Sequence, residues 1–299
     1  MKICVLGSDG AILDQIPALR KGFEALGHTM TKDISDPDAA FVFSGNPWYD
    51  DIYSHESIYG KTKKTVFNVL DVPVHCYDFD YEKMYNRLLK ADRVTCISQF
   101  VRGQIKHFFN IDATVIYYPM KLVRPTGQKK YPEAKVLSAG RLRDPNKRFN
   151  ISISSLVRAG YNENQVATIG PEIVNYGIYH AVVSDEKLND LYNSVDYVMM
   201  TSFIEGIGLP AIEGACVGAI PIVLPDLSTY DEFWASSPMG PYYSTFISVN
   251  KIAEFIRYMD NNPIEKEAMK AAMLQYANIY LRPKFDIVEV AKRIINVYH

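Results

Sequence analysis

The sequence predicts an α/β protein with two doubly wound, mostly parallel sheets, and three observations support this fold class. Short apolar runs rich in β-branched residues alternate with amphipathic segments along the chain, as parallel strands alternate with crossover helices. A length of 299 residues is long for one average domain and suits two of about 150. A polar segment containing prolines and a glycine, residues 120–134, interrupts the alternation, as a linker between domains would.

The first half of the chain, residues 1–122, is predicted to form an N-terminal Rossmann-like domain. Strands are predicted at residues 2–6, 40–43, 65–70, 91–98 and 114–118, and helices up to residue 26, at 81–89 and at 99–109. The first strand runs into Gly7-Ser8-Asp9-Gly10 and a helix N-terminus, an arrangement that can hold an anion and makes Gly10 a candidate anion contact. A polar, aromatic loop at 44–49 is a place where a ligand could dock.

The second half, residues 131–282, is predicted to form a C-terminal α/β domain. Strands are predicted at residues 135–138, 165–169, 180–183, 195–200 and 219–224, and helices up to residue 160, at 186–194, from residue 209 and around 252–259. A last amphipathic helix is predicted around 287–298, after this domain. Ligands in open α/β sheets collect where strands end and helices begin. The loop 140–148 and Gly170 both follow predicted strands.

The organising stretch is residues 195–226, which reads as one strand–helix–strand unit with Glu205 on its loop and Glu213 within the helix. Both glutamates fall at the end of the sheet where ligands bind. Glycine permits a close backbone approach, and the helix dipole favours negative charge. Candidate anion contacts at this helix start are Gly206, Ile207, Gly208 and Leu209. The alternative is an ordinary crossover whose glutamates are merely solvated.

The context of the two glutamates, E-G-I-G-L-P-A-I-E-G between buried strands, resembles the E-x7-E signature of retaining family-4 glycosyltransferases. The sequence departs from the usual signature at Ile207, Gly214 and Cys216, which we interpret as packing positions. Three further segments resemble the family: the L-x-x-A-G-R-L…K segment, ADRVTCISQFVRGQI, and FDIVEVAKRIINVYH at the end of the chain.

The resemblance implies a GT-B fold, with a nucleotide-sugar donor bound mainly by the second domain, 131–282, and contacted by Gly10 of the first. It implies that the first domain, 1–122, binds the acceptor, for which the loop at 44–49 is a place to dock, and that a final helix, 283–299, packs on this domain. It implies that Arg141 and Lys147 bind the donor diphosphate. The lysine lies one residue later than is commonest in the family, so Arg148 is a rival. Glu205 would contact the donor sugar near the reacting carbon and Glu213 the ribose, with a UDP- or GDP-hexose type of donor and a small-molecule, glycan or glycolipid acceptor.

The sequence departs from the family after the strand at 65–70. The family often has His-Asp there, and the histidine touches the donor sugar. Here the pair is Leu70-Asp71, and the nearest histidine is His75, which either takes that place or is structural. If the enzyme were inverting, Asp9 would be the base we would expect.

No metal or other cofactor is expected, because cationic side chains and a helix end can neutralise a diphosphate. D-x-D sequences at Asp36–Asp38 and Asp78–Asp80 could bind manganese in a different glycosyltransferase fold. We interpret the first as a turn into a strand and the second as a helix N-cap.

Composition limits the binding partners and cellular locations that we expect for the protein. A net charge of −2 makes broad binding to nucleic acid unexpected. No apolar run is long enough to predict a transmembrane helix, and four cysteines without C-x-x-C spacing suggest a reducing cytoplasm. Alternative functions on the same fold are a nucleotide-sugar epimerase, a phosphorylase and a non-catalytic sugar-nucleotide binder.

Overall fold

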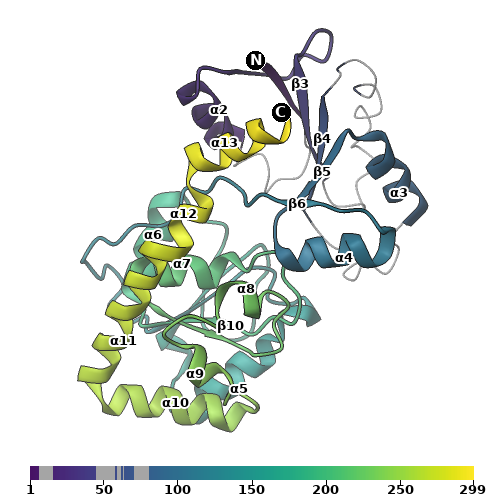
Figure 1. Cartoon of the computed structure of the whole chain (residues 1–299). Helices are drawn as coiled ribbons and strands as arrows, with labels where there is room; N and C mark the ends of the chain where they lie inside the picture. Colours follow the sequence, from purple (N-terminus) through teal and green to yellow (C-terminus); the bar gives the residue numbers. More distant parts are fainter. Residues whose placement is uncertain (7–15, 45–57, 59–61, 63, 71–80) are drawn as a thin grey trace. The chain divides into compact units, whose positions relative to one another are not determined.

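The computed structural model describes residues 1–6, 16–44, 58, 62, 64–70 and 81–299. The chain divides into two compact units (Figure 1). Unit 1 comprises Met1–Lys121 and Pro283–His299, and unit 2 comprises Leu122–Arg282. The end of the chain therefore belongs to the same unit as its beginning.

Unit 1 contains a parallel sheet in the order β2-β1-β3-β4-β5-β6. Its described elements are β1 (Lys2–Leu6), α2 (Ile16–Ala25), β2 (Thr29–Thr31), β3 (Ala39–Ser44), β4 (Thr65–Val69), α3 (Tyr81–Lys90), β5 (Arg93–Cys96), α4 (Gln99–Phe109), β6 (Thr114–Val115) and α13 (Ile287–Val297). The winding of the sheet changes direction between β1 and β3, as in doubly wound folds. All five residues of β4 are buried, which explains why this strand reads as a continuous apolar run.

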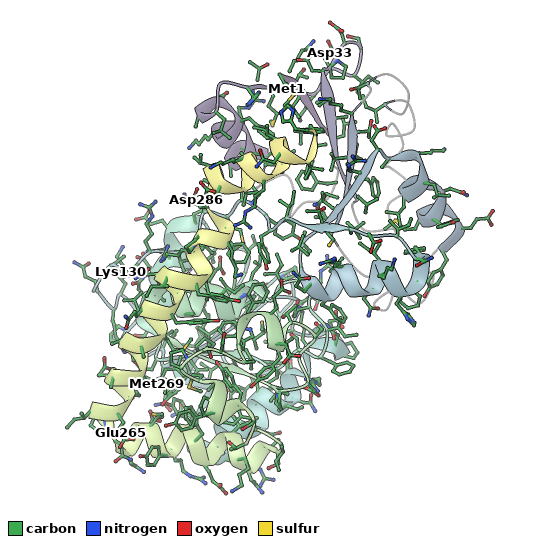
Figure 2. All side chains as sticks on the ribbon, viewed as in Figure 1. Met1, Asp33, Lys130, Glu265, Met269 and Asp286 are labelled. Carbon is green, nitrogen blue, oxygen red and sulfur yellow. The ribbon has the colours of Figure 1, made fainter. Side chains whose placement is uncertain are left out.

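The last helix, α13, packs against α2, and Figure 1 shows the two side by side. Gly22 makes the close approach possible, because a Cβ at this position would lie 2.6 Å from the Ile287 carbonyl oxygen. Asp286 (labelled in Figure 2) caps α13 by accepting from the amides of Val288 and Glu289, each at 3.0 Å. The buried residues of α13, such as Val290 and Ile294, complete the core on this side of unit 1.

Unit 2 contains a second parallel sheet, in the order β11-β10-β7-β8-β9. Its described elements are β7 (Val136–Ala139), η3 (Pro145–Lys147), α5 (Phe149–Ala159), η4 (Glu163–Gln165), β8 (Val166–Ile169), β9 (Ile178–His180), α6 (Asp185–Ser194), β10 (Tyr197–Met200), α7 (Leu209–Val217), β11 (Ile220–Val223), α8 (Tyr230–Phe233), α9 (Gly240–Tyr243), α10 (Val249–Asn261), α11 (Pro263–Tyr276) and η5 (Ala277–Leu281), with α12 (Arg282–Phe285) at the boundary. Because β7 is followed by β8 on one side and β10 lies on its other side, the topological switch point falls between β7 and β10. Ligands of such sheets bind at that point, beyond the carboxyl ends of the strands.

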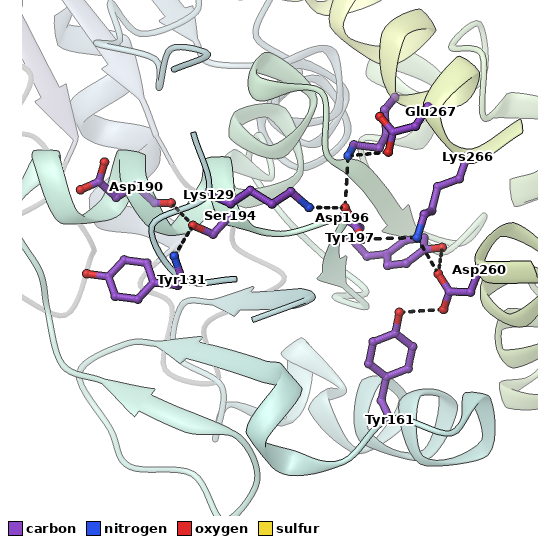
Figure 3. A network of polar contacts seen from close by, with 11 residues as sticks. Lys129, Tyr131, Tyr161, Asp190, Ser194, Asp196, Tyr197, Asp260, Lys266 and Glu267 are labelled. Carbon is purple, nitrogen blue, oxygen red and sulfur yellow. Dashed lines mark hydrogen bonds and ion pairs between the residues drawn. The ribbon is translucent and has the colours of Figure 1, made fainter. Parts of the chain in front are cut away.

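A polar network anchors unit 2 at the opposite, amino end of β10 (Figure 3). Asp196, 6% exposed, accepts from Lys129 Nζ at 2.8 Å and from Lys270 Nζ at 3.1 Å. Lys266 bridges the second oxygen of Asp196 to Asp260. Burial alone would raise the pKa of Asp196, but the hydrogen bond from Lys129 and the charges of these lysines hold it well below its usual range. The network ties the segment after unit 1 to α11 and keeps the amino end of β10 fixed.

The secondary structure differs from expectation in several places, and helices α8, α9 and α11 were not predicted from the sequence. The strand predicted at 180–183 lies at Ile178–His180, because the edge of the sheet is partly exposed there and lacks a clear apolar pattern. Strand β2, of three residues, was not predicted. Among the described residues, no helix has the length and apolar composition needed to cross a membrane.

Candidate functional site

Two loops of unit 2 meet at the switch point. One follows β7 and contains Arg141, Lys147 and Arg148, and the other follows β10 and contains Glu205. The sequence separates Lys147 from Glu205 by 58 positions. The pairing of β7 with β10 brings the loops to the same edge of the sheet. The structure thus brings together the predicted cationic residues and the first of the two predicted glutamates.

Asn146 joins the two loops through both its backbone and its side chain. The Asn146 amide group donates to the Ile204 carbonyl at 2.7 Å, and its oxygen accepts from the Ile204 amide at 2.8 Å. The backbone carbonyl of Asn146 accepts from the Phe203 amide at 3.0 Å. Paired bonds of this kind fix the position of the loop on each side of Glu205 and Lys147. Sequence reasoning did not find Asn146, although it stands next to the predicted lysine.

Arg148 holds the same loops together and has little donor capacity left for a ligand. Its guanidinium forms a two-pronged ion pair with Asp226 at 2.6 and 2.7 Å. It also donates to the carbonyls of Thr201 and Ser202 and lies over the Phe203 ring. Its backbone has a positive φ of 46°, uncommon for a residue other than glycine. Arg148 therefore holds the two loops in position, and of the two rival cations Lys147 has fewer protein partners.

Lys147 and Glu205 form the central contact of the site. The Lys147 ammonium lies 2.5 Å from Glu205 Oε1, and the two side chains are 21% and 15% exposed. Protein therefore covers most of both side chains, and a small part of each remains accessible to solvent. A hydrogen-bonded ion pair with limited exposure is stronger than a surface pair. Together the two side chains offer an acceptor and a donor for a polar ligand.

Ser228, just after β11, holds the backbone of Glu205. Its hydroxyl accepts from the Glu205 amide at 2.8 Å and donates to the Glu205 carbonyl at 2.9 Å. Thr229 beside it donates to the Ile207 carbonyl at 3.2 Å. Neither residue was predicted from the sequence. The sequence could have indicated both residues, because they follow the carboxyl end of the strand β11, where ligands of such sheets bind.

Helix α7 begins directly beyond Glu205. Gly208 forms its N-cap with a φ of 87° and provides no side chain to accept from the first amides, and Leu209 is the first helical residue. Glycine suits this position because its φ lies in the left-handed region that other residues rarely adopt. The amino end of α7, from Gly206 onward, thus remains a candidate anion contact.

The three departures from the family signature lie at tightly packed positions. Ile207 is 3% exposed and Cys216 is fully buried. A Cβ at Gly214 would lie 2.6 Å from Val198 Cγ2, so glycine lets α7 approach β10 closely. These three residues therefore serve packing around the glutamates.

Glu213 lies one turn into α7, near Tyr192 of α6. Burial raises the pKa of the Glu213 carboxyl to about 7, while the neighbouring Tyr192 hydroxyl partly counteracts this rise. The residue as a whole retains some exposure. A carboxyl in such surroundings accepts hydrogen bonds best once it has ionised. The two glutamates thus occupy different environments: Glu213 lies between helices α6 and α7, whereas Glu205 forms an ion pair with Lys147.

Arg141 and Gly170 occupy neighbouring strand ends. Arg141 is exposed, and no ion pair or hydrogen bond involves its guanidinium among the residues that the structure describes. A Cβ at Gly170 would lie 2.2 Å from the Gly140 carbonyl oxygen. This close approach of two backbones explains glycine at position 170 without a ligand.

Several predicted residues cannot be compared with the structure. Gly10, Asp9, His75 and the D-x-D at 78–80 lie outside the described residues. Asp38, from the other D-x-D, accepts from the Lys2 amide at 2.6 Å, in front of β1 and β3. It therefore serves as a turn residue at the amino ends of the strands, away from the ligand-binding end. In the described part of the chain, no group of histidines, cysteines or carboxylates is arranged to hold a metal ion.

Comparison with known proteins identifies the fold. No protein-family model and no curated protein sequence matches the chain. HepE from Anabaena, solved in complex with UDP and glucose, has a TM-score of 0.69 at 14% sequence identity, covering 99% of this chain and 98% of that one. The chain has the GT-B fold.

Two further GT-B structures are similar. WaaG, a glycosyltransferase involved in lipopolysaccharide biosynthesis, has a TM-score of 0.62 at 10% identity and covers 99% of each chain. TarM from S. aureus, solved as a mutant with UDP and α-GlcNAc-glycerol, has a TM-score of 0.64 at 15% identity. The match covers 88% of this chain and 56% of TarM, so this chain spans little more than half of the TarM chain.

Proposed function

We propose that the protein is a retaining glycosyltransferase that transfers a hexose from a nucleotide-diphosphate sugar to an acceptor hydroxyl without a metal ion. The observation that carries this proposal is the 2.5 Å contact between Lys147 and Glu205 at the switch point of the second sheet. This is the end of a doubly wound sheet at which nucleotides bind. The structural neighbours HepE and TarM, both solved with UDP, support a nucleotide as the ligand.

The donor diphosphate would be held by Lys147, by Arg141 and by the first amides of α7. Each is a hydrogen-bond donor with positive charge or partial positive charge, and such donors stabilise a leaving phosphate by about 3 kcal/mol each. A diphosphate would compete with Glu205 for the Lys147 ammonium. Once released from this ion pair, the Glu205 carboxylate could accept hydrogen bonds from hydroxyls of the donor sugar.

Glu213 would bind the ribose. Its carboxylate has two oxygens that suit a pair of adjacent hydroxyls, and its place one turn into α7 sets it apart from Glu205. In this assignment Glu205 acts at the reacting end of the donor and Glu213 at the nucleoside end.

Retention of configuration would follow from attack on the leaving-group face. As the bond from the anomeric carbon to the diphosphate oxygen breaks, the acceptor oxygen forms its bond to the same carbon on the same face. The acceptor proton moves to the departing phosphate oxygen, so atoms and charge balance without a separate protein base. The role of the cations is to stabilise the charge that develops on the diphosphate.

A panel of nucleotides and nucleotide sugars in a thermal-shift assay tests the proposal first. A matching nucleoside diphosphate at about 100 times its Kd should stabilise the protein by about 2.7 kcal/mol, a shift of several degrees. The protein is then incubated with the nucleotide sugar that stabilised it, in the presence of EDTA, and the sugar released by hydrolysis is followed by NMR. Slow hydrolysis with retained anomeric configuration supports the proposal.

Four results would contradict it. If no nucleotide stabilised the protein, the proposed donor site would be wrong. A product with inverted anomeric configuration would exclude a retaining mechanism. Isomerisation or phosphorolysis of the donor would indicate an epimerase or a phosphorylase. Activity that is lost with EDTA and restored by manganese would exclude metal independence.

A further inference from the structure

A cavity lies in unit 2 between the loop that follows β7 and the loop that follows β8. It has a volume of about 340 Å³ and is lined by residues 142–145, 148–150, 153 and 174–175. Cavities that bind small molecules have volumes of about 300–1,000 Å³, so this one is large enough for a small ligand. We call it the α5 cavity, because the first turns of helix α5 form part of its wall.

The floor of the α5 cavity is apolar. Leu142, Phe149 and Val174, each 9% exposed, form a small core cluster of their own, and Ile153 of α5 packs against it. All four side chains also line the cavity. Because the cluster is packed without a ligand, the cavity provides a preformed apolar surface.

The rim of the α5 cavity is polar and has unused hydrogen-bonding capacity. Arg143, Asn150 and Asn175 line the cavity and are exposed. In the part of the chain that the structure describes, no ion pair or hydrogen bond involves their side chains. Asp144 uses one carboxylate oxygen to accept from the Asn146 amide at 2.9 Å. A guanidinium only donates, a carboxylate only accepts and a carboxamide does both, so the rim offers donors and acceptors together.

The α5 cavity is separate from the contact between Lys147 and Glu205. Asn146 and Lys147 lie between the lining residues in sequence, but neither lines the cavity. Their side chains contact Ile204 and Glu205 instead. The loop after β7 therefore contributes some side chains to the candidate donor site and others to the α5 cavity.

We propose that the α5 cavity binds one neutral sugar unit. Sugar hydroxyls both donate and accept, as the hydroxyls of side chains do, and the C–H groups of the ring are apolar. A sugar thus matches a floor without polar groups and a rim with donors and acceptors. A wholly apolar ligand would cover the rim groups and leave them without partners, which costs free energy.

The charges at the rim favour a neutral ligand over an anion. Arg143 would attract an anion, but the Asp144 carboxylate lines the same cavity and would repel it. Arg148 also lines the cavity, but its guanidinium is neutralised by the two-pronged ion pair with Asp226. The positive and negative charges at the rim therefore nearly cancel.

Ligand-observed NMR of the full-length protein tests the proposal. The neutral probes are the methyl glycosides of glucose, galactose, mannose and N-acetylglucosamine, and glucose 6-phosphate is the anionic probe. Uridine is added as a competitor, to test whether the cavity is part of a nucleoside site. Direct binding is measured without a nucleotide sugar, so failure of this proposal is distinct from failure of the proposed transferase activity.

Two variants of the rim locate the binding. Asn150→Ala with Asn175→Ala removes two hydrogen-bonding side chains and should weaken glycoside binding about tenfold or more. Arg143→Gln removes the unpaired cation but keeps a donor, and should weaken binding less, about threefold.

Matched controls separate the cavity from other surfaces. Asn164→Ala with Asn261→Ala changes two exposed asparagines of unit 2 that do not line the cavity. Glu205→Gln reports on any glycoside that binds at the candidate donor site. Both controls should bind the glycoside as the wild type does.

The result expected is binding of at least one neutral glycoside to the wild type and weaker binding in both rim variants, with Tm near wild type. Arg143→Gln remains informative if the double asparagine variant misfolds. The proposal is wrong if no glycoside binds, if either control loses as much binding as the rim variants, or if uridine displaces the glycoside. Glucose 6-phosphate that binds more tightly than every neutral glycoside would also overturn it, because the cavity would then be an anion site.

Discussion

Lys147 donates to Glu205 across 58 residues of sequence, at 2.5 Å, and the neighbours of both residues are bonded to each other as well. Asn146 pairs with Ile204, and Arg148 with Thr201 and Ser202. The ion pair therefore lies between two loops whose backbones are already fixed. The loop backbones therefore require little reorganisation when a ligand displaces the ion pair.

Lys147 and Arg148 should respond differently to substitution. Lys147→Met removes the cation that pairs with Glu205 and should weaken nucleoside diphosphate binding by about 1.5–3 kcal/mol, the value of a hydrogen bond to a charged group, with a small change in Tm. Arg148→Met breaks the Asp226 ion pair and two carbonyl contacts, so its main effect should be a lower Tm. Calorimetric titration and thermal unfolding of both variants check this. A larger loss of affinity in a folded Arg148→Met protein would reverse the assignment.

Ser228 should affect turnover through the position of Glu205. Ser228→Ala removes both hydrogen bonds to the Glu205 backbone. A displacement of about 1 Å can cost up to 100-fold in rate, so we expect kcat to fall about tenfold or more, with KM for the donor changing little. Ser228→Thr keeps the hydroxyl and should restore much of the rate. If the alanine variant has wild-type kcat, Ser228 does not position Glu205.

The pKa of Glu213 predicts a pH dependence of nucleoside binding. With the pKa raised to about 7, the carboxyl is mostly protonated at pH 6 and mostly ionised at pH 8. The ionised form accepts both ribose hydroxyls, so affinity should rise about tenfold over this range, as expected for a single titrating group. A nucleoside is used because it has no phosphate that titrates nearby. Glu213→Gln should bind weakly at every pH, and a wild type without pH dependence would contradict the role given to Glu213.

Asp196 should contribute to stability in a pH-dependent way. Its pKa is depressed in the folded protein, so its contribution is present above the ordinary value of about 4 and is lost as pH falls toward the folded value. Asp196→Asn leaves three lysines without their shared anion and should lower the free energy of unfolding by about 3 kcal/mol at pH 7. Urea unfolding at pH 7 and pH 3 should show a smaller difference between the two proteins at pH 3. Lys251→Met, at an exposed pair with Glu254, is the control and should change little. An equal difference at both pH values would contradict the account.

The sequence predicted much of the fold because buried strands and amphipathic helices have recognisable patterns. Helix α4 was predicted with its observed bounds, Gln99–Phe109, and the strands around the glutamates within two residues. The edge strands β2 and β9 were missed or displaced, because they are three residues long and partly exposed. Patterns of burial contain little information about such strands.

The supporting side chains of the site were harder to predict than its charged residues. Asn146 and Ser228 act through hydrogen bonds to segments 58 and 23 residues away, and their roles depend on tertiary pairing of strand ends. No local spacing marks them.

The most direct test of the account compares Glu205→Gln with Glu213→Gln. Both are measured for release of nucleoside diphosphate from the donor and for binding of nucleoside diphosphate, after circular dichroism shows that they are folded. Interactions that strengthen in the transition state lower turnover when removed, whereas uniform binding contacts raise KM. Glu205→Gln should lower kcat by about 100-fold or more with nucleoside diphosphate binding near wild type. Glu213→Gln should mainly weaken that binding, by about 1–3 kcal/mol. Wild-type turnover in Glu205→Gln, or an equal loss of nucleoside diphosphate affinity in both variants, would contradict the roles assigned to the two glutamates.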